Sequence, residues 1–225
     1  MELKLTADNI FTIDKPVSWT SFDVVNKIRN ITRIKKVGHA GTLDPFATGV
    51  LVVLTGIFTK RQSEFMALEK VYRATVKLGE QTDTGDLTGQ VVKTMEVPEI
   101  NESILTTVAG RFMGEIDQVP PMYSAKKQNG KKLYELARAG KVIPREPRRV
   151  HVYDISIEAI DLPEFTMRIR CGKGTYIRTL AEDMGDSLNT CATLHALRRL
   201  AIGPYKIEDA ESIVAFEERW TSCAA

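Results

Sequence analysis

Five stretches of the chain are predicted to be helices. The first covers residues 20–31, where Thr20 and Asp23 have the spacing of a capping box ahead of an apolar face. A helical apolar face is also present at residues 175–188. The other predicted helices are residues 101–110, residues 130–140 ending at Gly140, and residues 209–218 with Asp209 as the expected N-cap. Helices are therefore expected throughout the chain.

Strands are predicted between these helices by apolar runs of two kinds. Residues 49–56 are apolar almost throughout, as in a strand buried on both faces, whereas residues 70–79 alternate and place Tyr72 on the inner face of a strand. Other extended stretches are residues 148–160 and 165–171, joined as a hairpin, and residues 195–205, while the polar residues 79–90 indicate a long loop. This irregular alternation favours the α+β class, with a mixed, mostly antiparallel central sheet and flanking helices.

The composition mainly excludes classes of protein. The chain has 225 residues, 43% of them hydrophobic and 27% charged, which is typical of a globular protein. No apolar stretch is long enough to span a membrane, and the N-terminus does not have the pattern of a secretory signal. The three cysteines have no C-x-x-C spacing, which argues against a disulfide framework or a zinc site and favours a reducing cytoplasm.

Charge is unevenly distributed, although the net charge is only +2. Between Lys126 and Arg149 nine lysines and arginines accompany only two glutamates, so that the segment of about residues 120–150 is strongly basic. A local positive field of this kind suits a polyanion such as a nucleic acid. A basic surface that is merely solvated explains the charge equally well.

A turn-rich stretch, GHAGTLDPFATGVLVV at residues 38–53, contains the aspartate Asp44 directly before Pro45. An aspartate before proline is confined to extended geometry and the proline fixes the next φ, so the loop orients the carboxylate at little entropic cost. Such rigidity suits a nucleophile or a general acid–base group. The plainer interpretation is a structural Asp-Pro turn, with His39 as a structural histidine.

A second glycine-rich stretch, CGKGTYIRT at residues 171–179, resembles a phosphate-binding loop only superficially. The upstream glycine of that motif is missing and Gly174 separates the lysine from the threonine. What remains is a strand-to-helix turn that presents Tyr176, which can stack on a base, and Arg178, which can clamp a carboxylate or a phosphate. A plain helix cap explains the same residues. The motifs of serine hydrolases and dinucleotide-binding enzymes are absent.

Six ordered blocks together resemble the bacterial tRNA pseudouridine-55 synthase family, of the TruB type, from about residue 10 to residue 210. The blocks are DKPVSWTS, GHAGTLDPFATGVL, KVYRATVKLGEQTDTGD, PPMYSAKKQNGKKLYELARAG, CGKGTYIRTLAEDMG and LHALRRLAIGPY. Two departures accompany the resemblance. The first block has Ser18 where the family usually has glycine. The chain also stops before the small C-terminal PUA-type RNA-binding domain of such relatives, so we expect weaker or less discriminating tRNA binding.

The resemblance implies a pseudouridine synthase fold around an RNA-binding cleft, with residues 1–225 as one catalytic domain. The implied activity is isomerisation of uridine 55 in the T-loop of tRNA to pseudouridine by a cytoplasmic monomer, with no cofactor and no metal. The main alternative is a tRNA-folding chaperone that uses the same cleft without needing catalysis. A guide-RNA-dependent synthase subunit and a glycosidase using Asp83 or Asp86 are weaker alternatives.

The resemblance also assigns roles to individual residues. It makes Asp44 the catalytic aspartate, which either adds to C1′ or assists removal of the C2′ proton, and makes Arg178 its ion-pair partner. Tyr72 stacks on the target base and assists loss of the C5 proton, while His39 takes the space left by the flipped base. The remaining assignments are Tyr176 and Leu197 in the uracil pocket, and Lys126, Arg145, Arg148 and Arg149 on the RNA backbone.

Overall fold

The computed structural model describes residues 7–124, 127–128, 131–138, 140 and 143–224. The chain forms two compact units. Unit 1 comprises Met1–Arg73 and Leu197–Ala225, and unit 2 comprises Ala74–Ala196. The chain passes from one unit to the other within two strands, β4 (Lys70–Leu78) and β12 (Ala192–Ile202).

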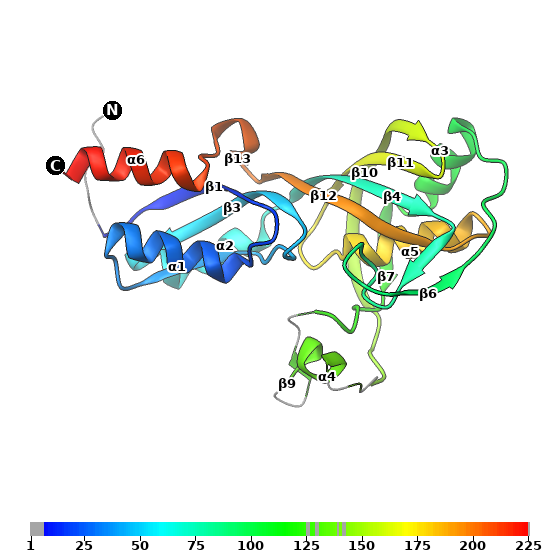
Figure 1. Cartoon of the computed structure of the whole chain (residues 1–225), viewed down its shortest axis with the longest axis horizontal. Coiled ribbons are helices and arrows are strands. Elements are labelled where there is room, and N and C mark those ends of the chain that lie inside the picture. Colours follow the sequence, from blue (N-terminus) through cyan, green and yellow to red (C-terminus); the bar gives the residue numbers. More distant parts are fainter. Residues whose placement is uncertain (1–6, 125–126, 129–130, 139, 141–142, 225) are drawn as a thin grey trace. The chain divides into compact units, whose positions relative to one another are not determined.

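Unit 1 is organised around the buried strand β3 (Thr48–Thr55). β1 (Ile10–Lys15) pairs antiparallel with one edge of β3. The other edge pairs with two strands, antiparallel with β2 (Val37–Ala40) and parallel with β12 at Arg198 and Arg199. The other elements are α1 (Ser21–Thr32), the 3₁₀ helix η1 (Gly56–Arg61), α2 (Gln62–Ala67), β13 (Tyr205–Lys206), the 3₁₀ helix η2 (Ile207–Asp209) and α6 (Ile213–Ala224) (Figure 1).

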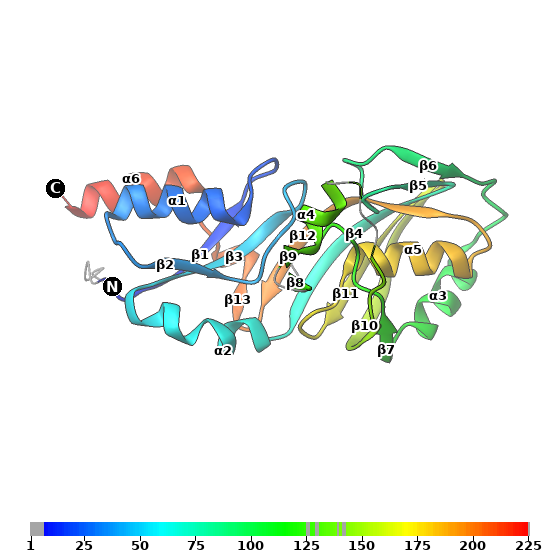
Figure 2. The same ribbon diagram turned by 90° about the horizontal axis from the view of Figure 1, so that it is seen from below.

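Helices cover both faces of β3, which explains why its sequence is apolar without alternation. Leu51 and Val53 pack with Phe11 from β1 and with residues of α1 and α6, including Phe216, whose ring centroid lies 4.9 Å from that of Phe11. The alternate side chains, such as Val52, pack towards α2. Figure 2 shows α1 and α6 on one side of these strands and α2 on the other. A strand buried on both sides has no polar face to display.

Unit 2 contains a sheet with the strand order β4, β11, β10, β7. β10 (Arg148–Asp161) pairs antiparallel with β11 (Glu164–Cys171) and with β7 (Gly114–Gln118). α3 (Glu102–Arg111) packs on β10 and contacts α5 (Ile177–Ser187), whose apolar face is buried. The smaller elements are the pair β5 (Glu80–Thr82) and β6 (Val91–Thr94), the pair β8 (Lys127–Gln128) and β9 (Lys131–Lys132), and α4 (Leu133–Arg138).

The structure confirms the predicted class, a mixed α+β fold with mostly antiparallel strand pairing. It also confirms the capping box of α1, because Thr20 Oγ1 accepts from the Asp23 amide at 3.1 Å and Asp23 Oδ2 accepts from the Thr20 amide at 2.8 Å. The predicted hairpin is β10–β11. The stretch 79–90 is only partly a loop, since it begins with β5.

The predicted N-cap of the last helix, Asp209, is wrong. Asp209 ends the 3₁₀ helix η2, and α6 begins four residues later. The Ser212 hydroxyl accepts a hydrogen bond from the Ala215 amide at 3.1 Å. The reason is a contact with β1, where Glu211 exchanges main-chain hydrogen bonds with Thr12 and Asp14. Because that bridge holds Glu211 extended, the helix can start only after it.

Ser18, where the family resemblance expects glycine, has φ of +67°. This is the left-handed region, which costs a non-glycine residue about 1 kcal/mol. The Ser18 amide donates to the Pro45 carbonyl at 2.9 Å, so the strained turn lies against the loop that contains Asp44.

We expect Ser18→Gly to raise the free energy of unfolding by about 0.5 kcal/mol at most, because glycine adopts this conformation without strain but its greater entropy when unfolded offsets much of the gain. Urea unfolding measures the change. The matched control is Ser63→Gly in the exposed face of α2, where the same substitution should destabilise the protein. A loss of stability in both variants would contradict the strain at position 18.

Burial of the Asp183 carboxyl on α5 raises its pKa to about 6, and the nearby charge of Asp186 adds to the effect. Because the folded state holds the proton more tightly than the unfolded chain, Asp183 stabilises the fold at pH values below about 4. That stabilisation is lost as the pH rises through 6. Asp183→Asn should therefore raise the free energy of unfolding at pH 7.5 by about 1 kcal/mol, after allowance for solvent screening of a half-buried group. Urea unfolding at pH 4.5 and pH 7.5 tests this, since the gain should be larger at pH 7.5.

Candidate active site

Asp44 lies in the loop between β2 and β3 in unit 1, and its side chain is half-buried. The loop closes in a turn in which the Ala47 amide donates to the Asp44 carbonyl at 3.1 Å. The preceding residue, Leu43, is buried, and its amide donates to Ser21 Oγ at 2.9 Å in the first turn of α1. The loop is thus attached to the neighbouring helix immediately before the aspartate.

The ammonium group of Lys15, at the end of β1, joins this loop to the preceding turn. Its Nζ donates to the carbonyls of Pro16, Trp19 and Pro45 at 2.9, 2.6 and 3.2 Å. Burial lowers the pKa of Lys15 to about 8, while the negative charge of Asp44 opposes that shift. At pH 7 the group is therefore mostly a cation, which binds the residue after Asp44 and attracts the Asp44 carboxylate.

His39, on β2, has a largely buried imidazole. Its Nδ1 is buried and has no hydrogen-bond partner in the described part of the chain. Burial lowers the pKa of His39, and the positive charge of Arg199 lowers it further. The ring is consequently neutral at pH 7. Its main-chain carbonyl accepts a hydrogen bond from Gln62 Nε2 at 2.6 Å, which ties this part of β2 to α2.

Two more predicted site residues, Tyr72 and Leu197, belong to unit 1. Tyr72 lies on the inward side of β4 and is 8% exposed, and Leu197 on β12 is 7% exposed. Their burial fits an apolar wall, although a core tyrosine and a core leucine would be buried to the same degree. Their placement against a substrate stays a prediction.

In unit 2, Tyr176 is the N-cap residue of α5. Its main chain is held by the buried side chain of Gln118 at the end of β7. The Tyr176 amide donates to Gln118 Oε1 at 2.9 Å, and Gln118 Nε2 donates back to the Tyr176 carbonyl at 3.2 Å. This reciprocal pair fixes the backbone from which the half-buried Tyr176 ring projects.

Arg178 is buried in the first turn of α5 and has several partners inside unit 2. Its Nη1 donates to the Thr84 carbonyl at 2.8 Å, its Nη2 donates to the Tyr123 carbonyl at 2.7 Å, and Nη1 lies 3.5 Å from Asp86 Oδ2. The side chains of Arg178 and Asp86 are only 5% and 6% exposed. Asp44 belongs to the other unit, so its pairing with Arg178 stays a prediction.

The sequence does not predict Asp86 as the partner of Arg178 and makes it a candidate only as a glycosidase carboxylate. Its other oxygen, Oδ1, accepts hydrogen bonds from Thr84 Oγ1 at 2.9 Å and from the Thr88 amide at 3.0 Å. The aspartate thus organises the loop after β5 while it neutralises the buried arginine. The only indication in the sequence that Asp86 belongs to the site is that the family-like segment 70–86 ends on this residue.

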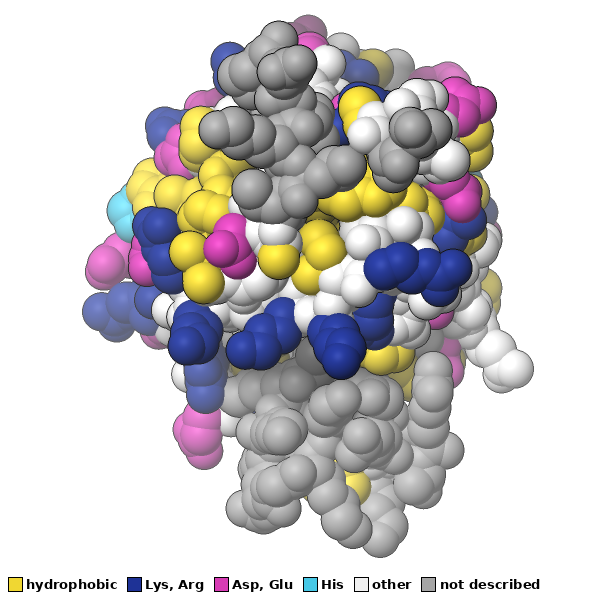
Figure 3. All heavy atoms as spheres, turned by 90° about the vertical axis from the view of Figure 1, so that its left-hand side faces the viewer, with side chains coloured by type: hydrophobic (Ala, Val, Ile, Leu, Met, Phe, Trp, Pro, Cys, Tyr) yellow, Lys and Arg dark blue, Asp and Glu magenta, His cyan; other side chains and the backbone are white. Residues whose placement is uncertain are grey.

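The residues predicted to contact the RNA backbone are only partly described. Lys126 lies outside the described residues. Arg145 is half-buried, whereas Arg148 and Arg149 are exposed at the start of β10, where Arg149 lies 3.6 Å from Asp117. Other exposed cations follow α1 in unit 1, namely Arg33, Lys35 and Lys36. Figure 3 shows lysine and arginine side chains across the side of the molecule that contains α1 and α6.

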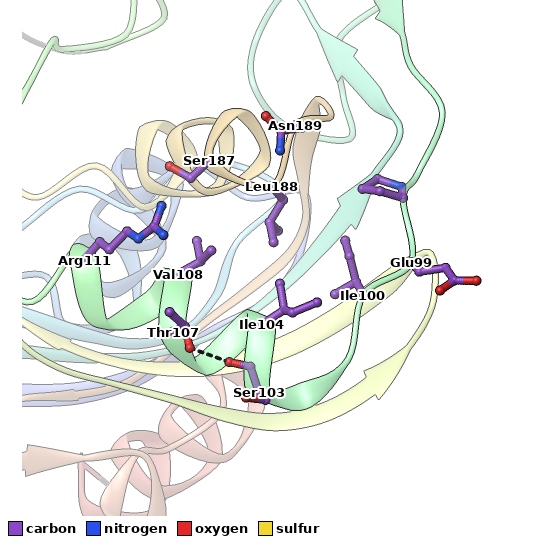
Figure 4. Close-up of a pocket in the computed structure, with 11 residues that line it drawn as sticks. Glu99, Ile100, Ser103, Ile104, Thr107, Val108, Arg111, Ser187, Leu188 and Asn189 are labelled. Atoms are coloured by element: carbon purple, nitrogen blue, oxygen red, sulfur yellow. Dashed lines mark hydrogen bonds between the residues drawn. The ribbon is translucent and has the colours of Figure 1, made fainter.

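A pocket of about 360 Å³ lies in unit 2 between α3, the end of α5 and the segment before α3 (Figure 4). Ile104 and Val108 from α3 and Leu188 from the end of α5 form its apolar part. It contains none of the predicted site residues. Within the described residues, no group of three or more His, Cys, Asp and Glu side chains could hold a metal ion, and no helix is long and apolar enough to cross a membrane.

Comparison with known proteins places the chain in a family. Residues 29–177 match the family described as TruB family pseudouridylate synthase (N terminal domain). The chain belongs to the TruB family. The match includes the loop of Asp44 and strand β4 and ends at the first residue of α5, so it contains most of the predicted site residues but not Arg178 or Leu197.

Relatives of this TruB-family chain share nearly half of its residues. A protein of Geotalea uraniireducens named tRNA pseudouridine synthase B is 47% identical over 90% of this chain and 66% of its own length. Proteins with the same name are 46% identical in Geobacter sulfurreducens and 44% identical in Flavobacterium johnsoniae. These matches cover 94% and 93% of this chain. The chain spans 69% of the Geobacter relative and 94% of the Flavobacterium relative.

Solved structures support the fold. The chain resembles one protein of a Cbf5–Nop10–Gar1 complex, with a TM-score of 0.76 and 28% identity over 98% of this chain and 57% of that chain. It also resembles a chain of an H/ACA ribonucleoprotein bound to a substrate RNA containing 2′-deoxyuridine, with a TM-score of 0.72 and 25% identity. That match covers 97% of this chain and 56% of the other.

Replacing Asp86 by asparagine should lower the free energy of unfolding by about 1–3 kcal/mol, because a buried guanidinium loses its charged partner. Urea unfolding at pH 7 measures the loss. Asp83→Asn is the matched control, since Asp83 is an exposed aspartate of the same loop and its substitution should cost less than about 0.5 kcal/mol. If Asp86→Asn and Asp83→Asn lowered the free energy of unfolding equally, the Asp86–Arg178 ion pair would contribute nothing to stability.

Proposed function

We propose that this chain converts a uridine in the T-loop of tRNA, at position 55, to pseudouridine. The observation that carries the proposal is the half-buried Asp44 on a loop fixed by Lys15 and Ser21. The resemblance of the block GHAGTLDPFATGVL to the family assigns the catalytic role to this aspartate. The names of the relatives agree with a tRNA substrate. A rigid carboxylate beside a cation is suited to act at the sugar of a bound nucleotide.

The proposed reaction breaks the N1–C1′ bond of uridine, turns the uracil and joins its C5 to C1′. C5 then loses a proton and N1 gains one, so atoms and electrons balance without an oxidant, a reductant or a cofactor. Asp44 either adds to C1′ and is later displaced, or assists removal of the C2′ proton on a glycal route. Both routes need the carboxylate to be ionised and fixed next to the ribose.

The other residues would bind and orient the base. Tyr72 would stack on the target uracil and assist removal of its C5 proton, with Tyr176 and Leu197 as the other walls of the pocket. Flipping the base out of the T-loop costs a few kcal/mol of lost stacking. A neutral His39 can occupy the vacated space, since its lowered pKa leaves no charge to desolvate there.

Arg178 would pair with Asp44 when the substrate is bound, in addition to its contact with Asp86. Arg145, Arg148, Arg149 and Lys126 would hold the RNA backbone, and their contribution should fall as the salt concentration rises. We also propose that residues 1–225 act together as one catalytic domain, as a monomer in the cytoplasm.

The test is pseudouridine formation in an unmodified tRNA transcript, mapped by position, for the wild type, Asp44→Asn and the control Asp154→Asn. Asp154 is an exposed aspartate on β10. We expect the wild type and the control to modify one T-loop uridine. Asp44→Asn should bind tRNA with similar affinity but lose at least about 10⁴-fold in rate, because it lacks the group that reacts.

Two results would contradict the proposal. Turnover by Asp44→Asn at the wild-type rate would remove the aspartate from the chemistry. A wild-type chain that binds and refolds tRNA but modifies no uridine would favour the alternative of a tRNA-folding chaperone.

A further inference from the structure

Arg199, on β12 in unit 1, is the largest fully buried side chain among the described residues, and it is 1% exposed. The roles assigned above do not include it. Its Nε donates to the Val50 carbonyl at 2.7 Å, its Nη2 to the Gly41 carbonyl at 3.0 Å, and its Nη1 to the Thr42 carbonyl at 3.4 Å. All of its hydrogen-bond partners in the described part of the chain are main-chain carbonyls.

These carbonyls lie on both sides of Asp44 in the sequence. Gly41 and Thr42 follow His39 and precede the aspartate, while Val50 lies beyond the loop in β3. One planar guanidinium therefore binds the beginning of the loop and the strand into which the loop leads. The guanidinium fixes both the position and the orientation of the main-chain carbonyls that it binds, because its N–H donors point in set directions within one rigid plane.

The main chain is also tightly packed around Arg199. Gly49 lies opposite it in the pairing of β3 with β12 and has φ of +100°. A Cβ at Gly49 would lie 2.2 Å from the Arg199 carbonyl oxygen, so only glycine allows the two strands this approach. Gly41 has φ of +89°, and a Cβ there would lie 3.5 Å from Arg199 Nη1. The backbone of Arg199 is therefore held close to β3, and its guanidinium is in van der Waals contact with the position of a Cβ at Gly41.

The charge of Arg199 acts on the groups of the proposed site. It lowers the pKa of His39 and that of Lys15, so its field reaches the residues on both sides of the Asp44 loop. Burying a cation that is satisfied only by carbonyl dipoles is costly, and an apolar side chain of similar volume would avoid that cost. The arrangement is therefore better explained by a requirement for this geometry and charge than by stability.

We propose that Arg199 is a positioning residue that holds the segment from His39, at the end of β2, to Asp44 in its reactive conformation. The role rests on the proposed function, since it acts through the aspartate and the histidine and touches no substrate itself. Lysine would preserve the charge but would lose the planar fork, and methionine would lose both.

The experiment compares Arg199→Lys and Arg199→Met with the same substitutions at Arg198. Arg198 is the matched control because it precedes Arg199 on the same strand but binds the side chains of Asp14 and Thr48, at 2.7 and 3.1 Å. The readouts are tRNA Kd and the single-turnover rate of pseudouridine formation with enzyme in excess, well below the Tm of every variant. We expect Arg199→Lys to lower the rate by about 100-fold with little change in Kd, and Arg198→Lys to lower it far less.

Two further readouts do not require turnover. Amide hydrogen exchange at residues 41–44 should be faster in both Arg199 variants than in the Arg198 variants. In NMR titrations the pKa of His39 should rise in Arg199→Met and stay unchanged in Arg198→Met. These readouts separate the two proposals, because a wild type that makes no pseudouridine would refute the function, whereas loss of exchange protection would still demonstrate the positioning of the loop.

The positioning role would be overturned by wild-type turnover in Arg199→Lys, or by equal exchange at residues 41–44 in the Arg198 and Arg199 variants. A loss of rate that simply followed the fall in Tm across all four variants would also overturn it, because that pattern indicates stability alone.

Discussion

The donation of three hydrogen bonds by the buried Lys15 ammonium is the interaction on which the rest of the site depends. Its acceptors are carbonyls of two segments that are about thirty residues apart in sequence, the turn from Pro16 to Trp19 and the Pro45 turn. Removing a cation from water is costly, and carbonyl dipoles together with the nearby Asp44 charge offset that cost. The same side chain therefore sets the shape of the loop and attracts its carboxylate.

Unit 2 uses a buried cation in a related way. The guanidinium of Arg178 binds the main chain at Thr84 and Tyr123, so one side chain joins the loop after β5 to the segment after β7. Each cation has an aspartate nearby, which is Asp44 for Lys15 and Asp86, at 3.5 Å, for Arg178. In both units a buried cation orders loops without regular structure through hydrogen bonds to their main-chain carbonyls.

Much of the fold could be predicted because its signals are local. The Thr20–Asp23 capping box and the apolar run of β3 each depend on residues close in sequence, and both are confirmed. Equally local signals predict Asp209 as a cap, and that prediction is wrong, because a bridge from Glu211 to β1 decides where α6 begins. A contact between residues about two hundred positions apart leaves no trace in helical periodicity.

The site was harder to predict for the same reason. Asp44 is marked by its own neighbours, the proline and the glycines, but the partners that hold it are not. Lys15 and Arg199 look in the sequence like ordinary surface charges, because only tertiary structure decides that a cation is buried. Asp86 and Arg178 are 92 positions apart, and neither residue type indicates the other. The turn at residues 171–179 points to Arg178 as a group that can bind a carboxylate, but only the structure shows that Asp86 lies beside it.

Unit 1 is built from two stretches of chain with all of unit 2 between them, and this order affects synthesis. When Arg73 has left the ribosome, one edge of β3 still lacks β12, and Phe11 still lacks Phe216 and Trp220. At roughly 5–20 residues per second, the missing pieces arrive many seconds later. During that interval a nascent sheet with an open edge and an uncovered aromatic patch is the state most exposed to aggregation and most in need of a chaperone. The loop of Asp44 can be completed only when the last part of the chain has emerged.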